Sequence, residues 1–227
     1  MLKYLINLLF PKLCLGCNAL LLNNEKIICS ECNHNLPITN HHFLEHNDTT
    51  KKFYGIIPIE FSASMLYFHH KGIVQNLIHN LKYKNHQEVG SLLGKWYAKD
   101  LETVSQIKTV SEIIPVPLHK KRLEERGYNQ VTTFCEALSN ELKIPYNPDL
   151  LYRSRYSKTQ TKKDKENRKD IANSLFDVNF TEADHNKHFL LVDDVMTSGA
   201  TLESCAKALL KIPNSKVSIV TIAYTLS

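Results

Sequence analysis

The chain has 227 residues, of which 43% are hydrophobic and 22% charged, so its composition is that of a globular protein with one α/β core and a small additional module. No apolar run approaches the ~20 residues of a transmembrane helix. The net charge is +5, and residues 153–170 account for it with eight basic and three acidic side chains. A neutral body with one basic segment argues against a protein that binds nucleic acid over its whole surface.

Residues 1–14 are apolar enough to be compared with a signal peptide. They contain one lysine ahead of a short apolar stretch, have no small-residue cleavage site and run directly into a cysteine pair. We therefore predict a short amphipathic helix that stays on the mature protein and packs on the core. Contact with a membrane surface or with a partner is the alternative.

Four cysteines follow the pattern C-x2-C-x11-C-x2-C: Cys14, Cys17, Cys29 and Cys32. Two such pairs allow four thiolates to converge on one tetrahedral structural zinc ion, and so small a module needs the metal to fold. The alternatives are two disulfides, which a reducing cytosol disfavours, and a redox pair, which needs no second copy. Cys135 and Cys205 fall on the apolar faces of predicted helices, where we expect buried packing residues.

Residues 37–53 are polar and contain a group of histidines: His41, His42 and His46. We predict that this segment is a linker or loop between the metal module and the main domain. A second metal site is the alternative, but the irregular spacing and the lack of a nearby cysteine argue against it.

The rest of the chain alternates strand-like and helix-like segments, which is typical of a parallel sheet flanked by helices. We predict strands at 56–59, 63–68, 111–118, 150–152, 189–192 and 217–224. We predict helices at 72–83, 89–101, 131–142 and 202–210.

A basic turn, HKKRLEERGYNQ, follows the strand predicted at 111–118. Arg122 and Arg126 are its notable residues, because planar guanidinium groups bind phosphate oxygens bidentately, with charge-assisted bonds worth roughly 1.5–3 kcal/mol each. Salt bridges from these arginines to Glu124 and Glu125 are the alternative.

The strand predicted at 189–192 leads into Asp193 and Asp194 and then into a hydroxyl-rich turn at the start of a helix. The turn consists of Thr197, Ser198, Gly199, Ala200 and Thr201. A helix N-terminus offers unpaired N–H groups, and the glycine and hydroxyls favour a close approach by a phosphate. The two carboxylates can accept hydrogen bonds from ribose hydroxyls or face Mg²⁺. The stretch predicts a ribose 5-phosphate site; a capped helix without a ligand is the alternative.

Residues 153–170 are basic, polar and poor in aliphatic side chains. We predict a loop that meets an anion, with Arg153, Gln160 and Arg168 as its candidate residues. A solvated loop without a ligand is the alternative.

The stretch VDDVMTSGAT (192–201) resembles the phosphoribosyl pyrophosphate (PRPP) motif of type I phosphoribosyltransferases, with Ser198 where many members have Thr. The resemblance implies that the two acids bind the ribose hydroxyls and that the turn binds the 5-phosphate. It also implies that Arg122 and Arg126 bind the pyrophosphate together with Mg²⁺. Lys82 joins the candidate PRPP-binding residues. The loop at 153–170 takes the place of the loop that closes over PRPP in those enzymes.

Further motifs extend the resemblance over nearly the whole chain, and together they resemble the ComF (ComFC) family of competence proteins. These motifs are the four-cysteine module, LIHNLKYKNH, IIPVPLHKKRLEERGYNQ, R-x-x-I-x-N-x-x-F and LLVDDVMTSGAT. The resemblance implies a bacterial cytoplasmic protein, or one at the inner face of the membrane. It implies a role in natural transformation, with single-stranded DNA and the helicase or processing proteins of the competence machinery as partners.

We therefore expect a zinc module at 1–38, a linker at 39–54 and a phosphoribosyltransferase-like domain at 55–227. The expected function is binding of Mg²⁺-PRPP and phosphoribosyl transfer to an acceptor, catalysed by positioning and charge neutralisation rather than by a protein nucleophile. One alternative is a non-catalytic PRPP or nucleotide sensor that contacts single-stranded DNA through the zinc knuckles and the basic loop. Another is a nucleobase-salvage phosphoribosyltransferase. The lack of a G-x-x-x-x-G-K-[ST] motif argues against a P-loop hydrolase.

Overall fold

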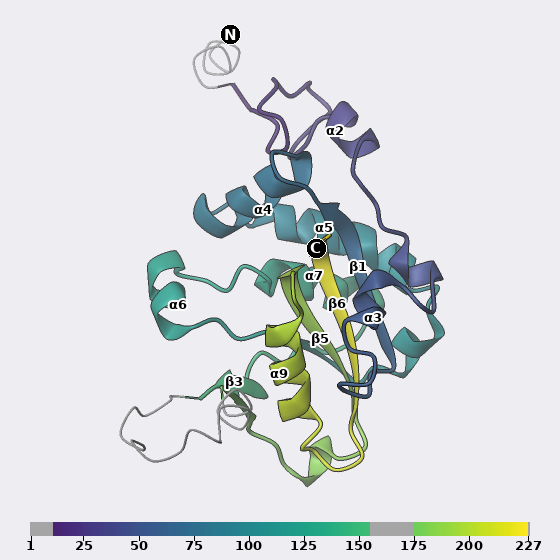
Figure 1. Cartoon of the computed structure of the whole chain (residues 1–227). Coiled ribbons are helices and arrows are strands. Elements are labelled where there is room, and N and C mark those ends of the chain that lie inside the picture. Colours follow the sequence, from purple (N-terminus) through teal and green to yellow (C-terminus); the bar gives the residue numbers. More distant parts are fainter. Residues whose placement is uncertain (1–10, 155–174, 227) are drawn as a thin grey trace.

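A four-stranded parallel sheet forms the centre of the computed structural model, which describes residues 11–154 and 175–226 (Figure 1). In spatial order the strands are β1 (Phe61–Phe68), β6 (Lys216–Thr225), β5 (His188–Met196) and β2 (Glu112–Pro115). Each neighbouring pair is parallel, so the carboxyl ends of all four strands lie at one edge of the sheet. The predicted fold class, a parallel sheet flanked by helices, is confirmed.

Helices cover both faces of this sheet (Figure 1). One face carries α4 (Ile73–Tyr83), α5 (Glu88–Leu101) and α7 (Thr132–Leu142). The other carries α9 (Ala200–Leu209) and a small antiparallel sheet of β3 (Leu151–Arg153) and β4 (Phe176–Val178). The shorter elements are α2 (Ser30–His34), η1 (His41–Phe43), α3 (Asp48–Lys51), η2 (Ser105–Thr109), α6 (Lys120–Arg126) and η3 (Glu182–Asp184).

The central strands are almost entirely buried, as their apolar runs require when helices cover both faces. Several of the polar side chains inside them are paired, whereas the buried Ser62 hydroxyl on β1 has no hydrogen-bond partner in the described part of the chain. Ser64 and Thr221 share a hydrogen bond of 2.6 Å between their hydroxyl oxygens, and the ring of His188 bonds Ser218 at 2.8 Å. These four side chains are therefore satisfied at little cost to the core.

Residues 39–54 lie against β1. The side-chain nitrogen of Asn47 donates to the carbonyl of Ser62 at 2.7 Å, and its oxygen caps α3 by accepting from the N–H groups of Thr49 and Thr50. His41, only 1% exposed, packs edge-on against a β1 tyrosine. The segment predicted as a linker thus has fixed contacts with the sheet, while the division into three regions stays a prediction.

Three local predictions differ from the structure. Residues 56–59 form a turn and irregular chain instead of a strand; Ile57 is buried against the core without a strand partner, and Pro58 has no N–H to donate to a ladder. The basic turn after β2 contains a seven-residue helix, α6. Asp193 and Asp194 lie within β5 rather than after it, because the strand continues to Met196.

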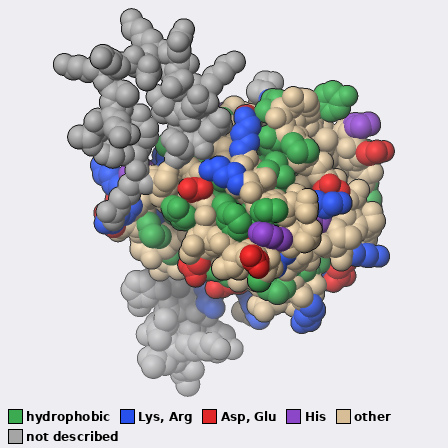
Figure 2. Space-filling view, turned by 90° about the horizontal axis from the view of Figure 1, so that it is seen from below, with side chains coloured by type: hydrophobic (Ala, Val, Ile, Leu, Met, Phe, Trp, Pro, Cys, Tyr) green, Lys and Arg blue, Asp and Glu red, His purple; other side chains and the backbone are tan. Residues whose placement is uncertain are grey.

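The amphipathic helix predicted at 1–14 falls mainly on residues 1–10, and most of the basic loop falls on residues 155–174; both stretches lie outside the described residues. Within the described part of the chain, no helix combines the length and apolarity needed to cross a membrane. On the face seen from below in Figure 2, the hydrophobic side chains are interspersed with charged and histidine side chains. Such a mixture is usual for a solvated protein surface.

Helices α5 and α7 pack closely because α5 carries a glycine at the contact. A Cβ added to Gly94 would lie 2.7 Å from the Cβ of Ala137 and 2.8 Å from the carbonyl oxygen of Phe134. These atoms belong to the helix backbone or adjoin it, so they cannot move aside as a flexible side chain could. The close packing of α5 and α7 explains why a glycine, which weakens a helix interior, occupies position 94.

We predict that Gly94→Ala lowers the free energy of unfolding by about 1–3 kcal/mol, although alanine favours an isolated helix, because overpacking outweighs propensity at this site. Denaturant unfolding followed by circular dichroism measures the change. Lys95→Ala on the exposed side of the same helix is the control and should stay within about 0.5 kcal/mol. A stabilised Gly94→Ala protein would show that the two helices are free to separate.

Candidate functional site

A cleft of about 770 Å³ opens at the carboxyl ends of the parallel strands, and side chains of α4 and α6 form part of its wall. This edge is where open α/β sheets bind ligands. The predicted site residues that line the cleft are Lys82, Arg122, Arg126, Arg153, Asp193, Asp194, Thr197 and Thr201. Ser198, Gly199 and Ala200 belong to the same turn but do not line the cleft. The structure thus brings together residues from four separate parts of the sequence.

The acidic pair differs in environment between its two members. Asp194 is buried and forms an ion pair of 2.8 Å with the Nζ of Lys82 on α4. Asp193 is half-buried, and its Oδ1 accepts a hydrogen bond of 2.8 Å from the backbone N–H of Asp194. Burial, followed by the charge of Asp194, raises the pKa of Asp193 from 3.8 to about 8. Asp193 therefore retains a proton at neutral pH in the ligand-free cleft.

Arg126 is held in position by two neighbours. Its Nη1 donates to Oε1 of Gln130 at 2.8 Å, its Nη2 donates to the hydroxyl of Tyr83 at 3.3 Å, and its guanidinium lies 4.9 Å from the centre of the tyrosine ring. A guanidinium fixed in this way presents its remaining donors in a defined direction. The contact also joins α6 to α4.

Arg122 is exposed on α6, a helix that buries none of its residues and stands away from the body of the molecule (Figure 1). The acids beside the arginines are paired elsewhere, since Glu124 lies 3.6 Å from Lys120 and Glu125 lies 4.0 Å from Lys121. The structure therefore gives no support to salt bridges between these glutamates and the arginines.

The turn at 197–201 forms the N-terminus of α9. Gly199 occupies the N-cap position with a φ of +83°, a backbone conformation that side chains disfavour, so glycine is needed there. Thr197 and Ser198 are exposed, and the Ser198 hydroxyl accepts from the N–H of Ala200 at 3.4 Å. The combination of a helix N-terminus and exposed hydroxyls is a geometry that binds a phosphate.

Several lining residues were not singled out by the sequence analysis: Phe68, His70, Gln75, Ile78, His79, Tyr83, Gln130 and Thr225. Most come from the ends of β1 and β6 or from one side of α4; Ile78, His79 and Tyr83 belong to the motif LIHNLKYKNH, which does not by itself assign them to the cleft. Gln130 contacts Arg126 although Gly127 ends α6 between them, so helical spacing does not predict this contact.

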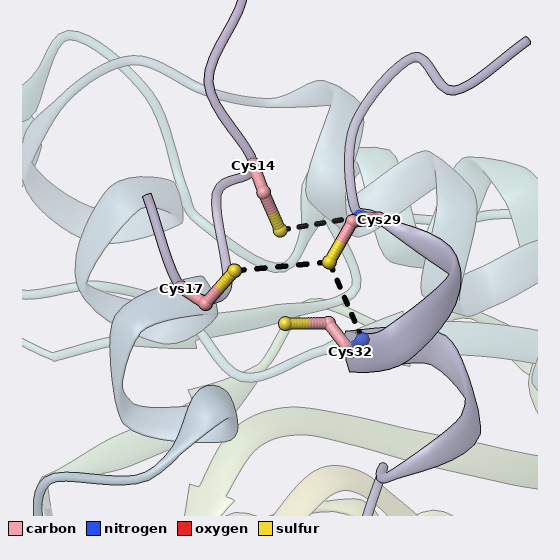
Figure 3. Close-up of side chains that lie close together, drawn as sticks. All are labelled: Cys14, Cys17, Cys29 and Cys32. Atoms are coloured by element: carbon pink, nitrogen blue, oxygen red, sulfur yellow. Dashed lines mark hydrogen bonds between the residues drawn. The ribbon is translucent and has the colours of Figure 1, made fainter. Parts of the chain in front are cut away.

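The four N-terminal cysteines converge (Figure 3). Their sulfur atoms all lie within 4.8 Å of one another. The Cys14 sulfur accepts hydrogen bonds from the N–H groups of Gly16 at 3.3 Å and Cys29 at 3.2 Å, which stabilises a thiolate. The sulfurs of Cys17 and Cys29 lie 3.7 Å apart, far beyond the ~2.05 Å of a disulfide. Four converging sulfurs with N–H donors fit a structural zinc ion.

The other two cysteines, Cys135 and Cys205, are fully buried, as predicted. Burial raises the pKa of both thiols well above 9.0, so they remain protonated packing residues.

The cysteine module is attached to α4 by side-chain amides. Asn76 donates to the carbonyl of Gly16 at 2.7 Å, and Asn80 donates to the carbonyl of Leu15 at 2.9 Å. A Cβ on Gly16 would lie 2.9 Å from both the Cys32 sulfur and a methyl group of Ile73, so the close approach depends on glycine. The module therefore contacts the same helix that carries Lys82.

Comparison with known proteins defines the class of the C-terminal part of the chain. Residues 132–227 match the phosphoribosyl transferase domain family, so this part is a phosphoribosyltransferase-like domain. Lys82, Arg122 and Arg126 lie outside the matched residues. Adenine phosphoribosyltransferase of Leishmania tarentolae, a solved structure, is 14% identical, with a TM-score of 0.38 over 66% of this chain and 74% of that one. The fold assignment depends on the sheet topology and the family match rather than on this value.

The curated relatives are competence and DNA-utilization proteins. Competence protein F of Haemophilus influenzae is 29% identical over 63% of this chain and 64% of that protein, and DNA utilization protein YhgH of Escherichia coli is 28% identical over 66% of each. Competence protein ComFC of Bacillus subtilis is 32% identical over 44% of this chain and 38% of that protein. The similarity to ComF-type proteins is therefore confirmed, although this chain spans slightly less than two thirds of the length of the first relatives it matches.

We predict that the purified protein contains about one zinc ion per chain and that Cys17→Ser loses most of it, because three thiolates bind zinc less tightly than four. Metal analysis by mass spectrometry measures the content, with Cys135→Ala as the control that should keep its zinc. Removal of zinc by a chelator should loosen residues 14–32 first, as measured by hydrogen exchange. A metal-free protein of full stability would contradict the site.

We predict that Asp193→Asn stabilises the protein and that the gain increases from pH 5 to pH 8. Between pH 3.8 and about 8 the native protein holds a proton on Asp193 that the unfolded chain releases, so wild-type stability falls as the pH rises through this range. The asparagine variant lacks this cost. From pH 5 to pH 8, the stability advantage of Asp193→Asn over the wild type should increase by about 1 kcal/mol. This value is smaller than the full pKa shift implies, because the Asp193 side chain is only half-buried and solvent screens its charge.

Denaturant unfolding at pH 5, 6.5 and 8 measures this dependence. Asp177→Asn is the control: an ion pair with Lys211 lowers the pKa of Asp177, so that carboxylate is already ionised over the whole range. A gain that does not change with pH would show that Asp193 is ionised in the native protein.

Proposed function

We propose that this chain binds Mg²⁺-PRPP in the cleft and transfers the 5-phosphoribosyl group to an acceptor during DNA utilization. The observation that supports this best is the composition of one cleft at the carboxyl edge of a parallel sheet. An acidic pair, a hydroxyl turn at a helix N-terminus and two guanidinium groups surround the same space. These are complements for the three parts of PRPP: ribose, 5-phosphate and pyrophosphate.

In this proposal Asp193 and Asp194 bind the ribose hydroxyls and the turn at 197–201 binds the 5-phosphate. Arg122 and Arg126 bind the pyrophosphate, and Tyr83 keeps the second guanidinium in place. A lone pair of the acceptor forms a bond to C1 of the ribose while the bond from C1 to the pyrophosphate oxygen breaks. Mg²⁺ would neutralise the charge that develops on the leaving pyrophosphate.

The ligand-free electrostatics suit a polyanionic substrate. Two ionised carboxylates would repel phosphate groups, but Asp193 holds a proton and Asp194 is neutralised by Lys82. The acidic pair therefore carries little net charge before the ligand arrives. A protonated Asp193 can also donate a hydrogen bond to a ribose oxygen, which an ionised carboxylate cannot.

A second candidate is a non-catalytic PRPP or nucleotide sensor that contacts single-stranded DNA. Tyr152 favours it, because this ring is 44% exposed and precedes Arg153, which lines the cleft. An exposed aromatic ring beside a cation is suited to stacking and phosphate contact. Helicase or DNA-processing proteins would then be the partners. Salvage of a free nucleobase is less well supported, because the relatives are named for competence and DNA utilization.

We further propose the division of the chain into a zinc module at 1–38, a connecting segment at 39–54 and a phosphoribosyltransferase-like domain at 55–227. The cluster of four cysteines supports the first region, and the parallel sheet supports the third. Residues 39–54 connect these two regions, and their contacts with β1 hold them against the sheet.

We predict that the protein binds PRPP in the presence of Mg²⁺ and that the double variant Asp193→Asn/Asp194→Asn weakens binding by about tenfold or more, because a hydrogen bond to the charged Asp194 carboxylate is worth ~1.5–3 kcal/mol. Isothermal titration calorimetry measures both affinities. Asp177→Asn, which changes an acid outside the cleft, is the control and should bind like the wild type.

The outcomes separate the candidates. If the wild type and the double variant bind PRPP with equal affinity, the acidic pair does not bind the ribose. PRPP binding followed by release of pyrophosphate on addition of nucleobases, nucleotides or single-stranded oligonucleotides would establish transfer and identify the acceptor class. PRPP binding without pyrophosphate release from any of them would favour the sensor.

A further inference from the structure

The turn at 197–201 has a neighbour that is distant in the sequence. A Cβ added to Gly199 would lie 3.4 Å and 3.5 Å from ring atoms of Phe53 and 3.7 Å from the Cβ of Lys52. Phe53 is 1% exposed, so its ring is a fixed part of the core beneath the turn. Residues 52 and 53 therefore lie against Gly199 of the turn, although they do not line the cleft and lie well outside the family match at 132–227.

The backbone at this position is held in place. The N–H of Lys52 donates to the carbonyl of Thr49 at 3.2 Å, and the N–H of Phe53 donates to that of Thr50 at 3.1 Å, which continues α3 by one turn. Asn47 caps the start of α3 and bonds the β1 backbone. Lys52 thus projects from a fixed backbone position rather than from a loose segment.

One distance locates the ammonium group of Lys52. Its Nζ is 6.0 Å from the centre of the Tyr224 ring. Tyr224 is the register partner of Met196, the residue that immediately precedes Thr197. The half-buried side chain of Lys52 begins beside Gly199, and a lysine side chain is long enough for its ammonium group to reach the turn. The turn itself, TSGAT, contains no basic residue.

We propose that Lys52 is a phosphate-binding residue, whose ammonium group pairs with the 5-phosphate of the sugar phosphate held at the N-terminus of α9. The inference rests on the proposed function and adds a residue that neither the motif nor the family match contains. A phosphate dianion at this position would meet the N–H groups of the helix on one side and a cation on another. Selectivity for a phosphorylated ribose over free ribose follows from the added charge.

The test uses ligands that each correspond to one end of PRPP, so that the two ends of the cleft are probed separately. Ribose 5-phosphate probes the turn, and Mg²⁺-pyrophosphate probes the arginines. Calorimetric titrations compare the wild type with Lys52→Gln, Lys52→Arg and Lys51→Gln. Lys51 is the matched control, because it is the adjacent lysine, is 68% exposed and pairs with Asp48 at 3.1 Å. Thermal unfolding confirms that each variant is folded.

We expect Lys52→Gln to weaken ribose 5-phosphate binding about tenfold or more, the value of one charge-assisted hydrogen bond, with pyrophosphate binding changed less than twofold. Lys52→Arg should recover part of the affinity, and Lys51→Gln should match the wild type. Equal affinity of Lys52→Gln and wild type for ribose 5-phosphate would overturn the role of Lys52 and leave the PRPP site intact. Failure of the wild type to bind either ligand or PRPP would overturn both proposals.

Discussion

The ion pair between Lys82 and Asp194 is the interaction on which the candidate site depends. Asp194 is almost completely buried, and a buried carboxylate requires a partner, so α4 has to lie where its lysine reaches β5. The next residue of α4, Tyr83, contacts Arg126 and thereby links α6 to the same helix. Three sides of the cleft are therefore positioned by two adjacent residues of a single helix.

The same helix also contacts the cysteine module. Asn76 and Asn80 bond backbone carbonyls of the knuckle between Cys14 and Cys17, so the geometry of the knuckle and the position of α4 are linked. Side chains of Cys14, Cys29 and Cys32 belong to the same apolar cluster as the helices on this face of the sheet. The module is thus packed as part of the molecule, and its structure contributes to the position of the cleft wall.

Sequence reasoning identified what depends on local pattern. The apolar run of β5, the helix periodicity of α4, α5 and α7, and the spacing of the four cysteines each follow from neighbours along the chain, and the structure agrees with them. Residues 56–59 were assigned to a strand because an apolar run has the same appearance in a strand and in a buried turn. Contacts between distant segments, such as Tyr83 with Arg126, leave no periodic signal and were not predicted.

The motif at the end of β5 supplies hydrogen-bond donors and carboxylates but no cation, whereas PRPP carries several negative charges. The positive charge around the cleft comes from elsewhere: Lys82 on α4, Arg122 and Arg126 on α6, and Arg153 at the end of β3. Lys52 does not line the cleft, but it lies beside the turn at Gly199. The five cations lie on four different segments, and four of them are outside the residues that match the phosphoribosyl transferase domain. The positive charge that would suit a polyanion therefore depends on how the segments before residue 132 fold around the motif, so the motif alone does not determine the candidate site.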